Sequence, residues 1–229
     1  MRHATAREIM TSPVITVLPE TPIREIINLM LRSRISGVPV VDDDQRVVGV
    51  VSEADLLEKE DRPYPEPPLL SWHGRSLRLE RMVGRYRKAT GAVARDVMTE
   101  NLITAGEDTE VHELAHLMLR HGINRVLIVR DGRLAGIVAR ADVLKIFLRS
   151  DDNLLRTVRE TLARELYIEP ASLALTCENG VVTAAGTVDR HSDLVLVLKW
   201  IRSVDGVVAV RADDLAYRID DLALGKVAF

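Results

Sequence analysis

Residues 49–57, GVVSEADLL, decide the fold, because they return as residues 136–144, GIVARADVL. In both copies an apolar run leads into a polar segment with Asp at the same place, Asp55 and Asp142. Upstream of them, AREIMT at 6–11 returns as ARDVMT at 94–99. The upstream copies are 88 residues apart and the downstream copies 87, because one residue is lost in a turn. Similarity of this length in one register predicts an internal duplication.

The first copy is predicted to form a β-α-β-β-α unit. Residues 14–18 are a β-branched run that indicates a strand. Thr21 with Pro22 is typical of a helix start, and the spacing of apolar residues predicts one buried face for this helix. That face holds Ile23, Ile26, Ile27 and Met30.

The second half of the unit follows from two apolar runs. Residues 38–41 and 47–51 predict strands buried on both faces or in an interface. Ser52 begins a second helix. A unit of about 55 residues has a marginal core alone, so we expect the two copies to pack together.

The composition is that of a globular protein, and the chain divides into several predicted domains. The chain has 229 residues, 47% hydrophobic and 28% charged, with a formal net charge of −3 and the single cysteine Cys177. No export signal or transmembrane run stands out, so the expected location is the cytoplasm and a membrane partner is not expected. We predict repeats at 1–60 and 93–149, an insert at 61–92, a further module at 150–220 and a tail at 221–229.

The insert between the repeats is rich in proline and then basic. Four prolines within residues 63–68 preclude regular helix there. Residues 75–88 hold six basic residues against the single Glu80, a local charge of +5. A solvated basic helix is the plain interpretation; contact with nucleotide phosphates or with an acidic partner is the alternative. The net negative charge and the scarcity of aromatic residues argue against nucleic acid.

The last module is predicted as α-β-β-α-β. Asp151 or Asp152 can cap its first helix, and two strands at 173–177 and 181–187 are joined by the turn signal at 178–180. A helix over 192–203 and a strand from Gly206 toward Tyr217 complete it. The fold class is therefore α/β (α+β), two β-α-β-β-α repeats followed by a small separate module.

The repeated motifs resemble the CBS domain. They are Met10-Thr11, residues 37–42 (GVPVVD) and residues 49–55, together with their counterparts at 97–99 and 136–142. This resemblance implies a tandem pair with pseudo-twofold symmetry, which usually forms a homodimer. It also implies clefts for adenosyl ligands such as AMP, ADP, ATP or S-adenosylmethionine, and NAD belongs to the same ligand class. The last module resembles a BON domain through residues 180–182, 186–188 and 204–207.

The resemblance also implies which residues bind the ligand. Asp55 and Asp142 would accept hydrogen bonds from ribose hydroxyls, and Ser52 would donate to a phosphate at a helix N-terminus. Ser52 with Asp55 is equally a capping box, which begins many helices without any ligand. In the second copy Ala139 replaces the hydroxyl, which favours the Ser52 side for a phosphorylated ligand. Adenine would lie between the first strand and the following apolar segment of each copy. The candidate residues there are Ile15, Thr16, Val38 and Pro39 in copy one, and Ile103, Thr104 and Arg125 in copy two.

One motif points to a different class of protein. Residues 112–116, HELAH, match the H-E-x-x-H pattern of zinc proteases. The duplication aligns them with residues 24–28, an ordinary amphipathic helix, which leaves His112 and His116 on its wet side. We therefore predict no catalytic residue, no cofactor and no metal. The leading hypothesis is a regulatory adenosyl-ligand sensor that acts through its last module on an unidentified protein. The alternatives are a scaffold with vestigial pockets and, remotely, a zinc hydrolase.

Overall fold

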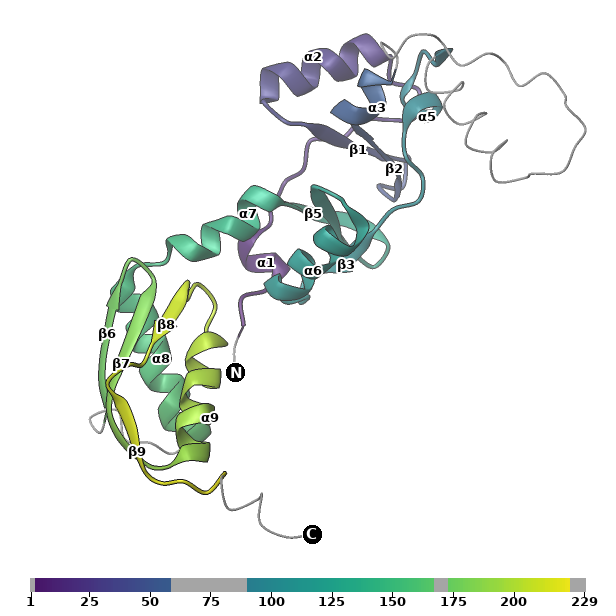
Figure 1. Cartoon of the computed structure of the whole chain (residues 1–229). Coiled ribbons are helices and arrows are strands. Elements are labelled where there is room, and N and C mark those ends of the chain that lie inside the picture. Colours follow the sequence, from purple (N-terminus) through teal and green to yellow (C-terminus); the bar gives the residue numbers. More distant parts are fainter. Residues whose placement is uncertain (1–2, 59–89, 167–172, 223–229) are drawn as a thin grey trace, which may run out of the picture. The chain divides into compact units, whose positions relative to one another are not determined.

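The computed structural model describes residues 3–58, 90–166 and 173–222 (Figure 1). The chain divides into two compact units. We call Thr5–Ala139 the repeat unit, and Met1–Ala4 with Arg140–Phe229 the C-terminal unit. The predictions for the basic insert fall on residues 59–89 and lie outside the described residues.

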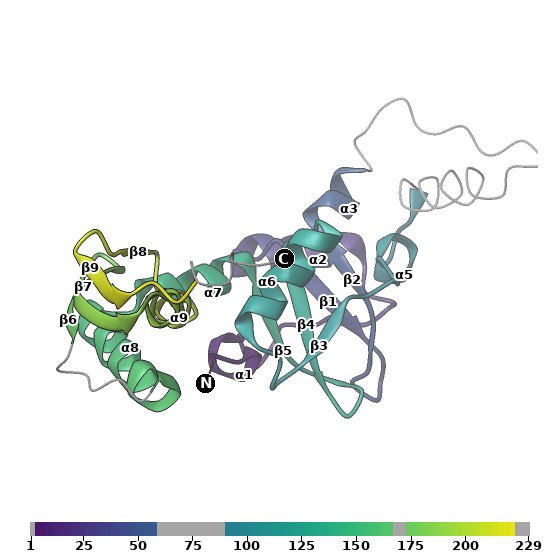
Figure 2. The same ribbon diagram turned by 60° about the horizontal axis from the view of Figure 1, so that its bottom comes forward.

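Each repeat consists of short helices and strands, and each begins with a helix, α1 or α5, that the predicted β-α-β-β-α order does not contain. The first repeat contains α1 (Ala6–Ile9), α2 (Ile23–Ser33), β1 (Gly37–Val41), β2 (Val47–Ser52) and α3 (Glu53–Leu57). The second contains α5 (Ala94–Val97), β3 (Thr104–Gly106), α6 (Val111–His121), β4 (Arg125–Arg130) and β5 (Arg133–Ala139). Its last helix, α7 (Arg140–Leu144), belongs to the C-terminal unit. β1 and β2 are antiparallel, and so are β4 and β5, while β3 lies parallel to β4 (Figure 2).

Three local predictions in the first repeat are wrong. Residues 14–18 form no strand; only Val17 makes a bridge, to Val40, and the run is bounded by Pro13 and Pro19. Thr21 does not cap α2, since its hydroxyl accepts from the Leu18 amide and Pro22 takes the N-cap position. Ile27 is 37% exposed, so the buried face of α2 is narrower than its apolar stripe.

The first helix of each repeat packs on the other repeat. The Ala6 amide of α1 donates to the carbonyl of Thr109, at 2.8 Å, and Thr11 pairs with Ile137 of β5. In the same way the Ala94 amide of α5 donates to the carbonyl of Thr21, at 2.9 Å. The two repeats therefore complete each other by a mutual exchange of their first helices.

The repeated glycines make this exchange possible. A Cβ added to Gly49 of β2 would lie 2.4 Å from the Met98 sulfur, and one added to Gly136 of β5 would lie 2.3 Å from the Met10 sulfur. Each methionine follows an exchanged helix and rests on the glycine of the other repeat. The repeated Met-Thr motif of one copy and the repeated Gly-apolar-apolar motif of the other therefore meet in one contact. A cluster of buried apolar residues lies beside it. Its members include Ile26, Val38, Val40, Val51 and Val97.

The C-terminal unit is a sheet with two helices on one face (Figures 1 and 2). After α7 and the 3-10 helix η1 (Lys145–Leu148) come α8 (Asp151–Leu166), β6 (Leu173–Glu178), β7 (Val181–Arg190), α9 (His191–Arg202), β8 (Ala209–Arg211) and β9 (Leu215–Ile219). β6 and β7 form the predicted hairpin, and the predicted last strand divides into β8 and β9, both parallel to β7. Within the described parts of the chain, no helix combines the length and the apolar character that crossing a bilayer requires.

Asp151 fastens the hairpin to α8. Asn179 and Gly180 take left-handed backbone angles, and both amides donate to the Asp151 carboxylate at 2.8 Å. The Cys177 thiol donates to it at 3.3 Å; burial raises the pKa of this thiol to about 11, which keeps the proton on sulfur. The predicted capping role of Asp151 is therefore replaced by a tertiary one. The Gly180 amide foremost, with the Cys177 thiol and the Asn179 amide, lowers the pKa of Asp151.

This carboxylate should make the C-terminal unit sensitive to acid. A carboxyl group whose pKa is lowered by folding stabilises the folded state above its unfolded pKa of about 3.9, and that contribution is lost as the pH falls through the folded value. We expect Asp151→Asn to be less stable than wild type at pH 7, with the difference closing below about pH 4. Urea unfolding in a Trp72→Phe background, followed by Trp200 in α9, measures this. A constant difference from pH 7 to pH 3 would contradict it.

Candidate functional site

A pocket lies where the two repeats meet, at the start of α3. Its volume is about 310 Å³. The first repeat contributes Val50, Ser52, Ala54 and Asp55. The second contributes Thr99, Asn101, Leu102, Ile103, Gly122, Ile123, Asn124, Arg125 and Leu127. The exchange of helices explains this composition, because it carries Thr99 and the residues after it onto β2.

Asp55 is the buried acid of this pocket. The residue is 6% exposed, and Ser52 is the N-cap of α3, where the Ser52 amide donates to one carboxylate oxygen of Asp55 at 2.8 Å. The Ser52 hydroxyl donates to the same oxygen at 2.6 Å, and the Thr99 hydroxyl donates to the other at 3.1 Å. The capping box is therefore real, and Thr99 adds a contact from the second repeat. These three donors hold the carboxylate in place in the pocket.

Arg125 crosses from the second repeat to the first. Its guanidinium donates to the Ser36 hydroxyl at 2.8 Å and occupies the space above Gly37, where a Cβ would lie 1.2 Å from Nη1. Burial lowers the pKa of Arg125, and the charges of Glu53 and Asp55 oppose that change. Nη1 is buried and has no hydrogen-bond partner among the described residues. This cation therefore stands beside the carboxylate of Asp55 with one donor group unused.

The pocket combines some of the residues that the sequence suggested and leaves others out. Ser52, Asp55, Ile103 and Arg125 line it together. Thr104, the first residue of β3, does not line the pocket. The copy-one candidates also lie outside its lining, namely Ile15, Thr16, Val38 and Pro39. Residues 14–18 nevertheless lie beside β1, because the Val17 amide donates to the Pro39 carbonyl at 3.1 Å. A binding role for the copy-one candidates stays a prediction. Thr99 was missed, although the repeated Met-Thr pair could have indicated it.

Asp142 is the counterpart of Asp55 and has different surroundings. It is buried in α7, and Lys145 forms an ion pair with it at 2.8 Å. In the aligned register Lys145 corresponds to Glu58 of the first repeat, and Ala139 corresponds to Ser52. The second acid therefore has a cation where the first repeat has an acid, and it lacks the hydroxyl.

The two histidines of the zinc-like motif lie on α6. Both are exposed, as the duplication predicted, and His112 contacts Glu110 at 3.1 Å. Among residues 3–58, 90–166 and 173–222, no cluster of three or more His, Cys, Asp or Glu side chains is placed to hold a metal.

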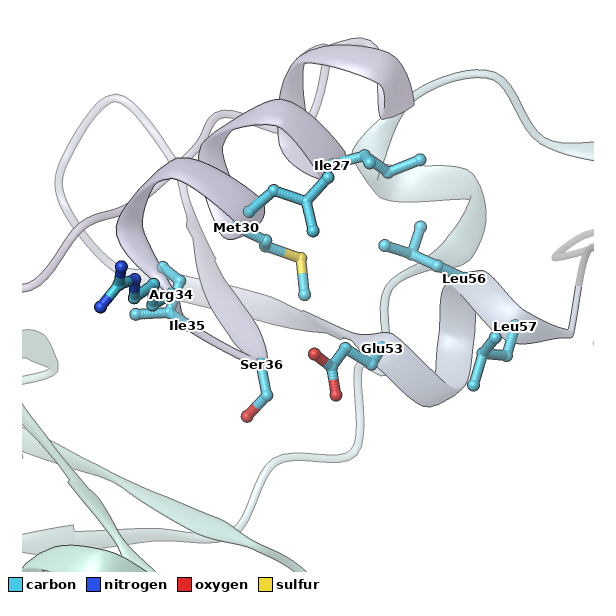
Figure 3. A pocket seen from close by; sticks show the side chains of 9 residues that line it. Ile27, Met30, Arg34, Ile35, Ser36, Glu53, Leu56 and Leu57 are labelled. Carbon is cyan, nitrogen blue, oxygen red and sulfur yellow. The ribbon is translucent and has the colours of Figure 1, made fainter.

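A second, larger hollow lies between α2 and α3 (Figure 3). Its volume is about 710 Å³, and we call it the α2–α3 groove. The groove is lined by Ile27, Met30, Leu31, Arg34, Ile35, Ser36, Glu53, Leu56 and Leu57. Figure 3 shows Ser36 and Glu53 near each other, and the Glu53 amide donates to the Ser36 carbonyl at 3.1 Å.

Two known domain families and several known proteins are similar to this chain. The CBS domain family matches residues 6–61 and 94–149, and the BON domain family matches residues 150–218. An uncharacterized protein, MJ1426, of Methanocaldococcus jannaschii is 31% identical over 156 residues, which span 62% of this chain and 90% of that protein. The inosine-5'-monophosphate dehydrogenase of the same organism is 32% identical over 141 residues, 61% of this chain but 23% of that enzyme.

Solved structures agree with this assignment. The crystal structure of CBSX2 in complex with AMP is 27% identical, with a TM-score of 0.55 over 63% of this chain and 96% of that chain. The CBS pair of MJ0100, solved with 5'-methylthioadenosine and S-adenosylmethionine, is 23% identical with a TM-score of 0.50 and shows the shared fold. The duplicated α/β repeats, the crossing pocket and these matches together show that the chain belongs to the CBS-domain proteins and carries a BON domain after its CBS pair.

Proposed function

We propose that this chain is a regulatory protein that senses an adenosyl ligand in the Asp55 pocket. The observation that carries the proposal is a buried carboxylate, held by Ser52 and Thr99, in a hollow whose other wall is apolar and amide-rich. CBSX2, which shares the fold at 27% identity, binds AMP. The proposal therefore gives the Asp55 carboxylate a role in ligand recognition.

Each part of an adenosyl ligand has a partner in this pocket. The cis-diol of ribose donates to Asp55 in charge-assisted hydrogen bonds. Leu102 and Ile103 supply apolar surface for adenine, and Asn124 supplies amide groups. Ser52 is a poor phosphate donor as it stands, because its proton already points to Asp55. The charge that neutralises a phosphate is therefore the guanidinium of Arg125.

The size of the pocket favours a small ligand. Its volume of about 310 Å³ is at the lower end of the usual range for ligand sites. This favours AMP over a dinucleotide such as NAD. Lys145 opposes a second diol at Asp142 by holding that carboxylate, so we propose one nucleotide for each chain.

We also propose that the partner of the α2–α3 groove is a second copy of the chain. Leu31 and Leu57 line the groove and are 72% and 67% exposed. Arg34 and Glu53 line the same groove with opposite charges (Figure 3). A twofold interface must be self-complementary, and a groove that presents apolar side chains together with both charges meets that condition.

The BON domain is the proposed output of the sensor. A ligand changes the state of a protein only by binding one arrangement more tightly than another. We propose that the preferred arrangement is transmitted through the BON domain to a protein partner. The identity of that partner and the cytoplasmic location stay predictions.

Titration calorimetry of the full chain tests the sensor. We expect AMP to bind with one site for each chain, and ADP, ATP, S-adenosylmethionine and NAD to bind more weakly. Ligand at 100 times its dissociation constant should stabilise the fold by about 2.7 kcal/mol in a thermal shift assay. If refolded, ligand-free protein gives neither heat nor a thermal shift with any of the five compounds, the pocket is vestigial and the scaffold hypothesis takes its place.

A further inference from the structure

One side chain connects the Asp55 pocket with the α2–α3 groove. Arg125 lines the pocket, and its guanidinium donates to Ser36, which lines the groove. The Ser36 carbonyl in turn accepts the amide of Glu53, the first residue of α3. The connection therefore runs from Arg125 through Ser36 to Glu53 by two hydrogen bonds.

The positive charge of Arg125 is also stabilised by two acids. Its guanidinium interacts with the carboxylate of Glu53 as well as with that of Asp55. The two carboxylates lie on different hollows, Asp55 in the pocket and Glu53 in the groove. Because one guanidinium attracts both carboxylates, a stronger attraction on the pocket side leaves less of its charge to offset Glu53.

We propose that Arg125 makes the pairing of two chains through the α2–α3 groove respond to the charge of the bound ligand. Without ligand, the guanidinium offsets the charge of Glu53 and weakens its attraction for Arg34 of a second copy. An anionic group in the pocket, which Arg125 lines, draws the guanidinium toward itself. Glu53 is then left to pair across the groove, and two chains associate more tightly. The inference rests on the proposed function for the identity of both the ligand and the partner.

Sedimentation of the full chain at fixed salt measures the effect. For wild type we expect saturating AMP to lower the dissociation constant of the dimer by at least about fivefold, the lower end of measured couplings between sites. Adenosine carries no phosphate and should leave that constant unchanged. By linkage, AMP must also bind the dimer more tightly than the monomer by the same factor.

Two variants distinguish the specific effect of Arg125 from the effect of removing any positive charge. Arg125→Gln should associate without ligand as tightly as wild type does with AMP, and should not respond to AMP. Arg130→Gln is the matched control, because it removes the same charge from the other end of β4, where Arg130 contacts Glu107. It should behave as wild type does. If Arg125→Gln does not fold, Ser36→Ala removes the hydrogen bond instead and should raise the affinity without ligand.

The outcomes distinguish this inference from the proposed function. If AMP binds wild type by calorimetry but leaves the dimer constant unchanged, or if Arg125→Gln still responds, the inference is overturned and the sensor stands. If AMP does not bind, the proposed function fails. Equal association of ligand-free wild type and Arg125→Gln then overturns the inference on its own. If the chain stays monomeric under all conditions, both the pairing of two chains through the α2–α3 groove and its regulation by Arg125 are overturned.

Discussion

Asp55→Asn should weaken the binding of AMP and of adenosine about tenfold, since the loss of one charge-assisted hydrogen bond from a ribose hydroxyl removes about 1.5 kcal/mol. The change keeps the shape of the side chain and removes its charge. It also alters the start of α3, where the carboxylate accepts from Ser52 and Thr99, and a lost helix cap costs about 1 kcal/mol. Titration calorimetry at a temperature well below unfolding separates the two effects.

Asp142→Asn is the control for this variant. It changes the aligned acid of the second repeat, which is ion-paired with Lys145. We expect it to leave the affinity for AMP as in wild type. The assignment of the pocket is wrong if Asp55→Asn binds adenosine as wild type does, or if Asp142→Asn causes the larger loss.

The second large effect concerns the exchanged helices. Gly49→Val should destabilise the repeat unit by about 2 kcal/mol, because its side chain would enter the space that the Met98 sulfur fills and overpacking has costs of this order. Met98→Ala alone leaves a cavity and should cost a similar amount. Since one change makes the room that the other needs, the double variant should be more stable than the sum of the single effects predicts. Urea unfolding measures all three.

Gly106→Val provides a comparison for the glycine change. Gly106 ends β3, and a Cβ there meets nothing closer than the Thr109 hydroxyl at 3.9 Å. This substitution should leave stability within about 0.5 kcal/mol of wild type. If Gly49→Val is as mild as Gly106→Val, or if the two changes at Gly49 and Met98 add without interaction, the contact between the repeats is not what holds them.

The features that depend on neighbouring residues were predictable from the sequence. The duplication, the cap of α3 at Ser52 and the hairpin turn at Asn179-Gly180 follow from local chemistry. The failures are tertiary. The spacing of Ile27 shows that it belongs to an apolar stripe, but spacing does not show how much of that stripe the core covers.

The site was predicted in part for the same reason. Ser52 and Asp55 lie three residues apart, so their contact is local and the motif contains it. Thr99 lies 44 residues from Asp55 and reaches it only because α5 packs on the first repeat. Aligning the two copies compares each position with its own counterpart and so conceals contacts between unlike positions. The pairing of Met98 with Gly49 is a contact of this kind, and it required the structure.

The exchange of α1 and α5 has a consequence for cutting the chain. A fragment that stops before residue 90 keeps β2 but loses the methionine that rests on Gly49 and the strand partner that Thr99 offers to Val50. A fragment that starts there loses the matching pieces from α1. Each half therefore lacks the exchanged helix that packs on its sheet, and that helix is present in the other half or in another molecule. Duplication in this chain did not produce two modules that can be separated, reordered or transplanted singly; it produced one indivisible pair.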